Sequence, residues 1–288
     1  MAKSPSHTLG ELIGDFFEES IIKYLHDYIP EGYYLDYRHS RKARNGKKEV
    51  IWADQYGNKH KLDIVIEKHG TEKKFGTPSA FIEMAWRRYT KHSKNKVQEI
   101  SGAILPLVEK YGRELPFYAA VLAGEFTDNA ITQLQSQGFF VLHFSYEEIC
   151  KVYDAVNISI HWEESSNDVF IQEIADEISE MTKKQKETLY TAFVKQQKKK
   201  LKKLSNSVTS ALSQSITEIT VVPLHGFVRT LRSINDAITY IMDYDENDSN
   251  PILRYEITVR YNNSVEYTMR CPDKTRAIQF LNHYINKK

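Results

Sequence analysis

The stretch SAFIEMAWRRYTKHSKNKVQEI, residues 79–100, joins an apolar strand, one carboxylate and a series of cations. Residues 80–82 have the character of a buried strand, and Glu83 follows where that strand should still be buried. A lone acid in an apolar strand is costly unless something neutralises it. Five cations then follow: Arg87, Arg88, Lys91, Lys94 and Lys96. This arrangement predicts a polar site on a buried strand.

The segments on either side of this stretch predict a sheet covered by helices. We expect a helix over 9–29, then short β-like runs at 32–37, 49–54, 60–67 and 79–86 that form a meander. Residues 55–58 (QYGN) are typical of a hairpin turn. A helix over 92–111 precedes strands at 116–126 and 138–145, which are apolar on both faces and separated by a short helix. The fold class predicted for this part is an α/β sandwich.

Charge segregation suggests where the chain divides. Residues 163–180 carry seven acids and no Lys or Arg, whereas residues 183–203 carry nine lysines and one Glu. An apolar stripe at three- and four-residue steps indicates helices here, interrupted near Thr182. These helices are either a solvated connection or a basic arm for a phosphate backbone or a dimer partner. The predicted division is therefore a domain at 1–160, a charged arm or linker at 161–213 and a domain at 214–288.

The last segment predicts a small α+β unit. Strands are expected at 215–222, 252–261 and 264–271, with helices at 233–244 and from Asp273 to about residue 285. Asn262-Asn263 is a tight-turn signal between the second and third strands. One face of that hairpin carries Arg254 and Arg260, which could read a DNA groove. The alternatives are a solvated face or a subunit interface, so this unit is expected to serve recognition or dimerisation.

Composition excludes several classes of protein. The 288 residues contain no apolar run long enough for a membrane span, and the N-terminus lacks the layout of a secretion signal. Two distant cysteines fit no metal spacing, so a reducing cytoplasm is the expected location. The sequence has no Walker-type loop, no dinucleotide glycine fingerprint and no paired-histidine metal motif. Because the net charge is only +1, any basic surface must be local.

A second acid in an apolar strand gives Glu83 a partner. Asp63 lies between Leu62 and Ile64 in the run HKLDIVIE. Two acids on neighbouring strands could share a divalent cation, and the nearby basic residues could hold an anionic substrate. The competing interpretation is structural, with Asp63 paired to a lysine at 59 or 61 and Glu83 paired to an arginine at 87 or 88.

The order of these elements resembles the PD-(D/E)xK nuclease superfamily, which has the restriction-endonuclease-like fold. The resemblance covers residues 8–150 and depends on Asp63 followed twenty positions later by Glu83. It implies an α/β/α core with a central mixed sheet and Mg²⁺ ligated by these two acids. Families of this type often add an acid from the first helix, for which Glu18 is the best match and Glu11 the second.

The sequence departs from that superfamily at the motif lysine. The position two after Glu83 is Ala85. Arg87 points the same way as Glu83 further along the strand, and an arginine stabilises charge rather than accepting a proton. We therefore expect a lysine of the following helix, Lys94, to orient the attacking water, and Arg87 to contact the scissile phosphate. Arg88, Lys91 and Lys96 are further expected nucleic-acid contacts.

The expected function is a magnesium-dependent endonuclease of double-stranded DNA, similar to a type II restriction enzyme or another prokaryotic defence nuclease. A homodimer is expected because cutting both strands favours two sites. The alternatives are a binding or regulatory protein on a degenerate nuclease fold and a structure-specific DNA-repair nuclease. The sequence does not specify the recognition sequence, a dependence on base modification or the cleavage stagger.

Overall fold

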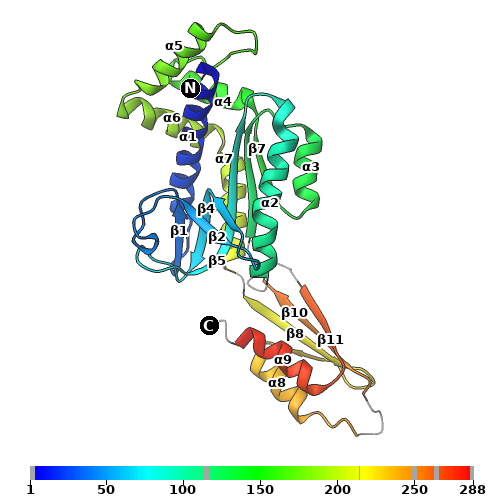
Figure 1. Cartoon of the computed structure of the whole chain (residues 1–288). Coiled ribbons are helices and arrows are strands. Elements are labelled where there is room, and N and C mark those ends of the chain that lie inside the picture. The colour runs from blue at the N-terminus through cyan, green and yellow to red at the C-terminus, as the bar shows by residue number, and fades with distance from the viewer. Residues whose placement is uncertain (1–3, 113–116, 214, 248–251, 263–265, 286–288) are drawn as a thin grey trace. The chain divides into compact units, whose positions relative to one another are not determined.

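The computed structural model describes residues 4–112, 117–213, 215–247, 252–262 and 266–285. The chain divides into two compact parts, Met1–Leu212 and Ser213–Lys288, which we name unit 1 and unit 2 (Figure 1). Within the described ranges, no helix is both long and apolar enough to cross a membrane.

A five-stranded mixed sheet forms the centre of unit 1, which confirms the predicted α/β class. Its order is β1-β4-β5-β6-β7. The β1–β4 and β4–β5 pairs are antiparallel, and β5, β6 and β7 run parallel. The strands are β1 (Tyr33–Tyr37), β4 (Ile64–Lys68), β5 (Thr77–Arg87), β6 (Phe117–Gly124) and β7 (Phe140–Phe144).

Two of the expected strands lie outside this sheet. β2 (Val50–Ala53) and β3 (Lys59–Leu62) pair with each other as a separate hairpin. The predicted turn closes it, and the Asp54 carboxylate accepts the backbone N–H groups of Tyr56 and Asn58, both at 2.9 Å. The expected meander is therefore wrong, because β1 pairs with β4 and the predicted strand 60–67 is broken at Asp63.

Helices cover both faces of the sheet (Figure 1). On one face α1 and α7 contact β5, and on the other α2 contacts β5 and β6. The α1 helix begins where the Ser4 hydroxyl accepts the His7 N–H at 3.3 Å. The first helices are α1 (Pro5–His26), α2 (Ser93–Tyr111), α3 (Asp128–Ser136) and α4 (Tyr146–Tyr153), and the 3₁₀ turns are η1 (Lys42–Arg44), η2 (Thr90–His92) and η4 (Asp154–Val156). The sequence did not indicate α4.

The charged segment predicted as an arm is part of unit 1. It forms α5 (Asp168–Ser179), α6 (Lys183–Gln196) and α7 (Lys198–Leu212). The predicted interruption is confirmed, because the Thr182 hydroxyl caps α6 by accepting the Gln185 N–H at 3.3 Å. The apolar stripe joins the core: the ring of Phe193 lies 5.9 Å from that of Phe17 on α1. Burial of this stripe makes the segment part of the domain rather than a solvated linker.

Unit 2 is a four-stranded antiparallel sheet with two helices. The sheet order is β11-β10-β8-β9, with β8 (Ile216–Pro223), β9 (Arg229–Leu231), β10 (Tyr255–Tyr261) and β11 (Glu266–Cys271). The helices are α8 (Ile234–Asp243) and α9 (Lys274–Ile285). The short β9 was not predicted, and Asn263 of the predicted turn lies outside the described residues.

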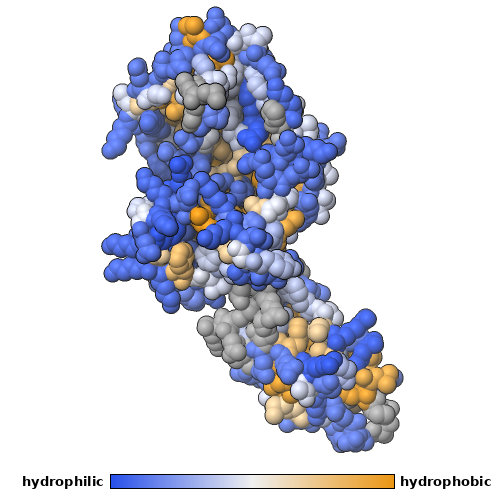
Figure 2. All heavy atoms as spheres, viewed as in Figure 1, coloured by the Kyte–Doolittle hydropathy of each residue, from blue (hydrophilic) through white to orange (hydrophobic). Residues whose placement is uncertain are grey.

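In the hairpin of unit 2, buried and less buried residues alternate along β10, but this alternation does not extend to the residues before the strand. Tyr255, Ile257 and Val259 are fully buried. Leu253, two residues before Tyr255 in the same alternation, is 70 % exposed because it precedes the strand. Hydrophobic residues also gather on the visible surface of unit 2 (Figure 2), and Phe227 is 85 % exposed.

Unit 2 consists of two successive ββα copies that share a sequence motif and a strand register. The sequence Glu-Ile-Thr-Val occurs at 218–221 in β8 and again at 256–259 in β10. Thr220 pairs with Thr230 across β8–β9, and Thr258 pairs with Thr268 across β10–β11, at the same spacing. The two repeats meet where Thr220 lies opposite Thr258 in the antiparallel β8–β10 pair. Equivalent residues facing each other across antiparallel strands define a pseudo-two-fold axis at that point.

Candidate functional site

The two predicted acids, Asp63 and Glu83, lie together where β3 turns away from the central sheet. Ile64 of β4 is opposite Ile82 of β5, and the next residues in each direction are the acids. The Asp63 carboxylate accepts the Met84 N–H at 2.7 Å, and the Glu83 carboxylate accepts the Asp63 N–H at 3.2 Å. Each carboxylate is thus held by the backbone of the neighbouring segment.

Burial disfavours the ionised form of both acids. It raises the pKa of Glu83 well above its usual range, and the nearby Asp63 carboxylate raises it further. Burial also raises the pKa of Asp63, against the Met84 N–H and the Lys96 charge, which lower it. Since Glu83 is only 7 % exposed, water compensates little of the mutual repulsion when both carboxylates are charged. A bound cation would relieve this repulsion.

The structural alternative for these acids is not supported by their contacts. Lys61 forms its ion pair with Glu49, at 2.9 Å, although its charge still lowers the pKa of Asp63. Arg87 donates to the Trp86 carbonyl at 2.9 Å, and Arg88 donates to the Trp162 carbonyl at 3.0 Å. Neither arginine forms an ion pair with Glu83 among the described contacts.

The structure favours Lys96 over Lys94 as the cation of the site. The positive charge of Lys96 lowers the pKa of both Asp63 and Glu83. Its side chain is 21 % exposed and also contacts Glu99 at 3.2 Å. Lys94 is exposed, and no described contact joins it to either acid. Lys96, also on α2, is therefore a stronger candidate than the predicted Lys94.

Glu18, the acid expected from the first helix, lies on α1 within the electrostatic influence of Asp63. Burial raises the pKa of Glu18 to about 7, and the charges of Asp63 and Asp15 act in the same direction. The Arg38 charge opposes them. Glu11, the second choice from the sequence, instead forms an ion pair with His7 at 3.2 Å.

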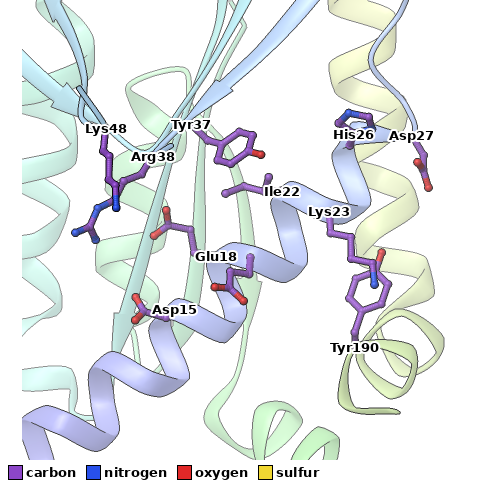
Figure 3. Close-up of a pocket in the computed structure, with 11 residues that line it drawn as sticks. Asp15, Glu18, Ile22, Lys23, His26, Asp27, Tyr37, Arg38, Lys48 and Tyr190 are labelled. Carbon is purple, nitrogen blue, oxygen red and sulfur yellow. The ribbon is translucent and has the colours of Figure 1, made fainter. Parts of the chain in front are cut away.

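Glu18 also lines a pocket of about 830 Å³ between α1 and the loop that follows β1. Asp15 and Glu18 line it from α1 (Figure 3). Tyr37, Arg38 and Lys48 line it from β1 and the adjoining loop. Neither Asp63 nor Glu83 lines this pocket, so Glu18 is the one acid of the predicted set that it exposes.

The remaining cations expected to bind nucleic acid from unit 1 differ in their surroundings. Arg87 lies four residues beyond Glu83, about 13 Å along the strand, so it is not at the acids. Arg88 is 12 % exposed, stacks 3.9 Å from the centre of the Tyr146 ring and holds the Trp162 carbonyl, which is a structural role. Lys91 is half exposed and forms an ion pair with Glu164.

The arginines of unit 2 are engaged in ion pairs on the open sheet face. Arg260 lies 2.5 Å from Glu266 and 3.1 Å from Glu218, and Arg254 lies 3.0 Å from Glu256. Cations and acids alternate along this face, so it is not a basic surface. A DNA groove would have to compete with these carboxylates for each arginine.

The donor set suits a divalent cation in part. Asp63 and Glu83 offer the hard carboxylate oxygens that Mg²⁺ prefers, at a place where their own repulsion is unrelieved. Among the described residues, however, no three His, Cys, Asp or Glu side chains are grouped closely enough to hold a metal ion. A cation here would be held by the acid pair, with water completing its coordination.

Comparison of the chain with protein-family models, with curated proteins and with solved structures found no match. The sequence analysis missed Arg38 and Lys48, both of which line the pocket. Their signal was the run RHSRKARNGKK at 38–48, which contains six Lys or Arg and no acid.

Proposed function

We propose that this chain is a magnesium-dependent endonuclease that hydrolyses phosphodiester bonds of double-stranded DNA. The observation that carries the proposal is the buried Asp63–Glu83 pair, whose pKa values the charge of Lys96 lowers. The Asp63 charge in turn raises the pKa of Glu18 on α1. A pair of buried acids with raised pKa values is typical of a functional site. The order of α1, β4, β5, α2 and β6 around this pair supports a restriction-endonuclease-like fold for unit 1.

Each group would have a separate role. Asp63 and Glu83 would bind Mg²⁺, which when bound supplies a Lewis acid for the phosphoryl oxygen. Lys96 would orient the attacking water and stabilise negative charge near the acids. Arg87, farther along β5, would contact a neighbouring phosphate rather than the scissile one. A type II restriction enzyme acting as a cytoplasmic homodimer is the form of this activity that we favour, because two sites allow cleavage of both strands.

The first test is cleavage of unmodified and methylated plasmid DNA with Mg²⁺. Wild-type protein should give discrete fragments, Glu83→Gln should give none, and Lys96→Gln should cut at least about 100-fold more slowly. Lys94→Gln is the matched control, since it removes the same charge from the same helix, and it should retain activity. Loss of activity in Lys94→Gln with full activity in Lys96→Gln would reverse our assignment of the two lysines.

Ala85 at the motif-lysine position supports a second candidate, a DNA-binding protein on a degenerate nuclease fold. That candidate predicts wild-type protein that binds DNA equally well with Mg²⁺ or with a chelator and cuts none of these substrates. A structure-specific repair nuclease would instead leave plasmids intact and cut branched or flapped duplexes.

A further inference from the structure

The loop between β1 and β2, residues 38–48, has an unusual division of its six cations. Arg41 and Arg44 are buried, at 0 % and 8 % exposed, whereas Arg38, Lys42, Lys47 and Lys48 are exposed. The loop contains no acid to neutralise the four exposed side chains. In Figure 2 the surface over the loops beside β1 is largely hydrophilic.

The two buried arginines fix the path of this loop. The Arg41 guanidinium donates to Asp36 at 2.7 Å and to Glu67 at 2.5 and 3.0 Å, and both acids are fully buried. Arg44 pairs with the same Asp36 and donates to the His39 carbonyl at 2.6 Å. Buried, fully paired guanidinium groups of this kind leave a loop few alternative conformations.

A second basic loop, residues 69–76, is joined to the first by the same arginine. Arg41 donates to the Thr71 carbonyl at 2.7 Å and to the Lys74 carbonyl at 2.9 Å. The backbone N–H of Ala43 donates to the Glu72 carbonyl at 3.0 Å. Gly76 closes the second loop so tightly that a Cβ there would lie 2.2 Å from the Lys68 carbonyl oxygen. The two loops therefore form one rigid platform.

Both ends of the 38–48 loop lie at the pocket that contains Glu18. Arg38 and Lys48 line the pocket that Glu18 lines from α1 (Figure 3). The acids Asp15 and Glu18 stand on the α1 side, so a phosphate is favoured on the loop side. Lys42 and Lys47 extend the same run of exposed cations through the loop.

We propose that residues 38–48 form a preorganised clamp for the DNA phosphate backbone, in which Arg38, Lys42, Lys47 and Lys48 contact phosphates flanking the acid site. This inference rests on the proposed function for the choice of DNA as the polyanion. Cations carried by a rigid loop lose little conformational entropy when they bind phosphates. This explains why buried ion pairs hold a surface loop in place. Arg41 and Arg44 are positioning residues of the clamp and do not contact DNA.

The test measures binding apart from cleavage, in the Glu83→Gln background with a chelator and a fluorescent duplex of about 30 bp. In the clamp variant, Arg38, Lys42, Lys47 and Lys48 are all changed to Gln. The matched control changes four exposed lysines of α6 and α7, Lys195, Lys198, Lys199 and Lys202, to Gln. Circular dichroism and thermal unfolding verify that both variants are folded, since neither alters the buried network.

The clamp variant should bind the duplex at least about tenfold more weakly than the Glu83→Gln parent. The slope of its log association constant against log salt concentration should be less negative by about 2 to 4, because each lost phosphate contact contributes about 0.9 to that slope. The control should bind within about twofold of the Glu83→Gln parent. Equal losses in both variants, undiminished binding by the clamp variant, or no DNA binding by the parent would each overturn the clamp. If the clamp result is obtained but wild-type protein never cuts, the nuclease proposal fails and the clamp stands.

Discussion

Replacing Glu18 by Gln tests the electrostatics of the site without any assumption about DNA. The pKa of Glu18 is raised from 4.5 to about 7, chiefly by burial. An acid with a higher pKa in the folded chain holds its proton more tightly there than in the unfolded chain. The folded state therefore loses stability as the pH rises from about 4.5 to about 7. Gln keeps the shape of the side chain and removes this loss.

The size of the effect follows from the pKa difference. A rise from 4.5 to about 7 corresponds to ~3 kcal/mol of unfolding free energy once the carboxylate is ionised. Because Glu18 is only half-buried, solvent screening reduces the expected value to about 1–2 kcal/mol. Glu18→Gln should therefore exceed wild type by that amount near pH 8 and by about a quarter of it near pH 5.

Urea denaturation over this pH range, with a chelator present, measures the difference. Glu19→Gln is the control, because Glu19 is the next residue of α1 and is exposed, and its effect should stay within about 0.5 kcal/mol. A gain for Glu18→Gln that is as large near pH 5 as near pH 8, or no gain near pH 8, would refute the raised pKa of Glu18 and its cause.

Three further predictions concern the network, the loops and the metal. Glu67→Gln should lower the unfolding free energy by about 3–5 kcal/mol, since it leaves Arg41 buried without its main partner. As a control, Glu49→Gln breaks the exposed pair with Lys61 and should lower the unfolding free energy by at most about 1 kcal/mol. Gly76→Ala should lower the unfolding free energy measured in urea by about 1–3 kcal/mol, because the added methyl group meets backbone atoms. Gly102→Ala, in α2 with no atom near its Cβ, should raise it by about 0.5–1 kcal/mol. Mg²⁺ near pH 8 should raise the melting temperature of wild type but not of Asp63→Asn, and an equal rise in both would show that the ion binds elsewhere.

The acids of the site could be predicted from the sequence, whereas the cations around them could not. Asp63 and Glu83 are conspicuous because each interrupts an apolar run, and strand pairing then brings them together. The choice between Lys94 and Lys96 depends on how α2 is rotated. That rotation is fixed by the burial of Val97, Ile100, Ile104 and Leu107 after the 3₁₀ turn η2, which the sequence pattern did not reveal.

The course of the fold was predictable where periodicity is strong and failed where pairing is non-local. Most helices and strands lie near their predicted positions, but hydrophobic alternation does not say which strand is a neighbour. For example, the pairing of residues 33–37 with β4, which leaves β2 and β3 as a separate hairpin, could not be read from the alternation. Similarly, the stripe from Ile174 to Leu212 predicted helices correctly, but its burial against α1 depends on contacts that no local pattern encodes.

The repeat in unit 2 has a consequence for how such a sheet can be assembled. Because Thr220 faces its own counterpart Thr258, a two-fold rotation applied to one ββα copy generates the whole four-stranded layer. A free copy could meet a second free copy through the same strand pairing, with one threonine opposite the other. Here both copies belong to one chain, so equivalent positions can carry different residues. Position 260 now carries an arginine between two acids, where its counterpart in the first copy, residue 222, is a valine.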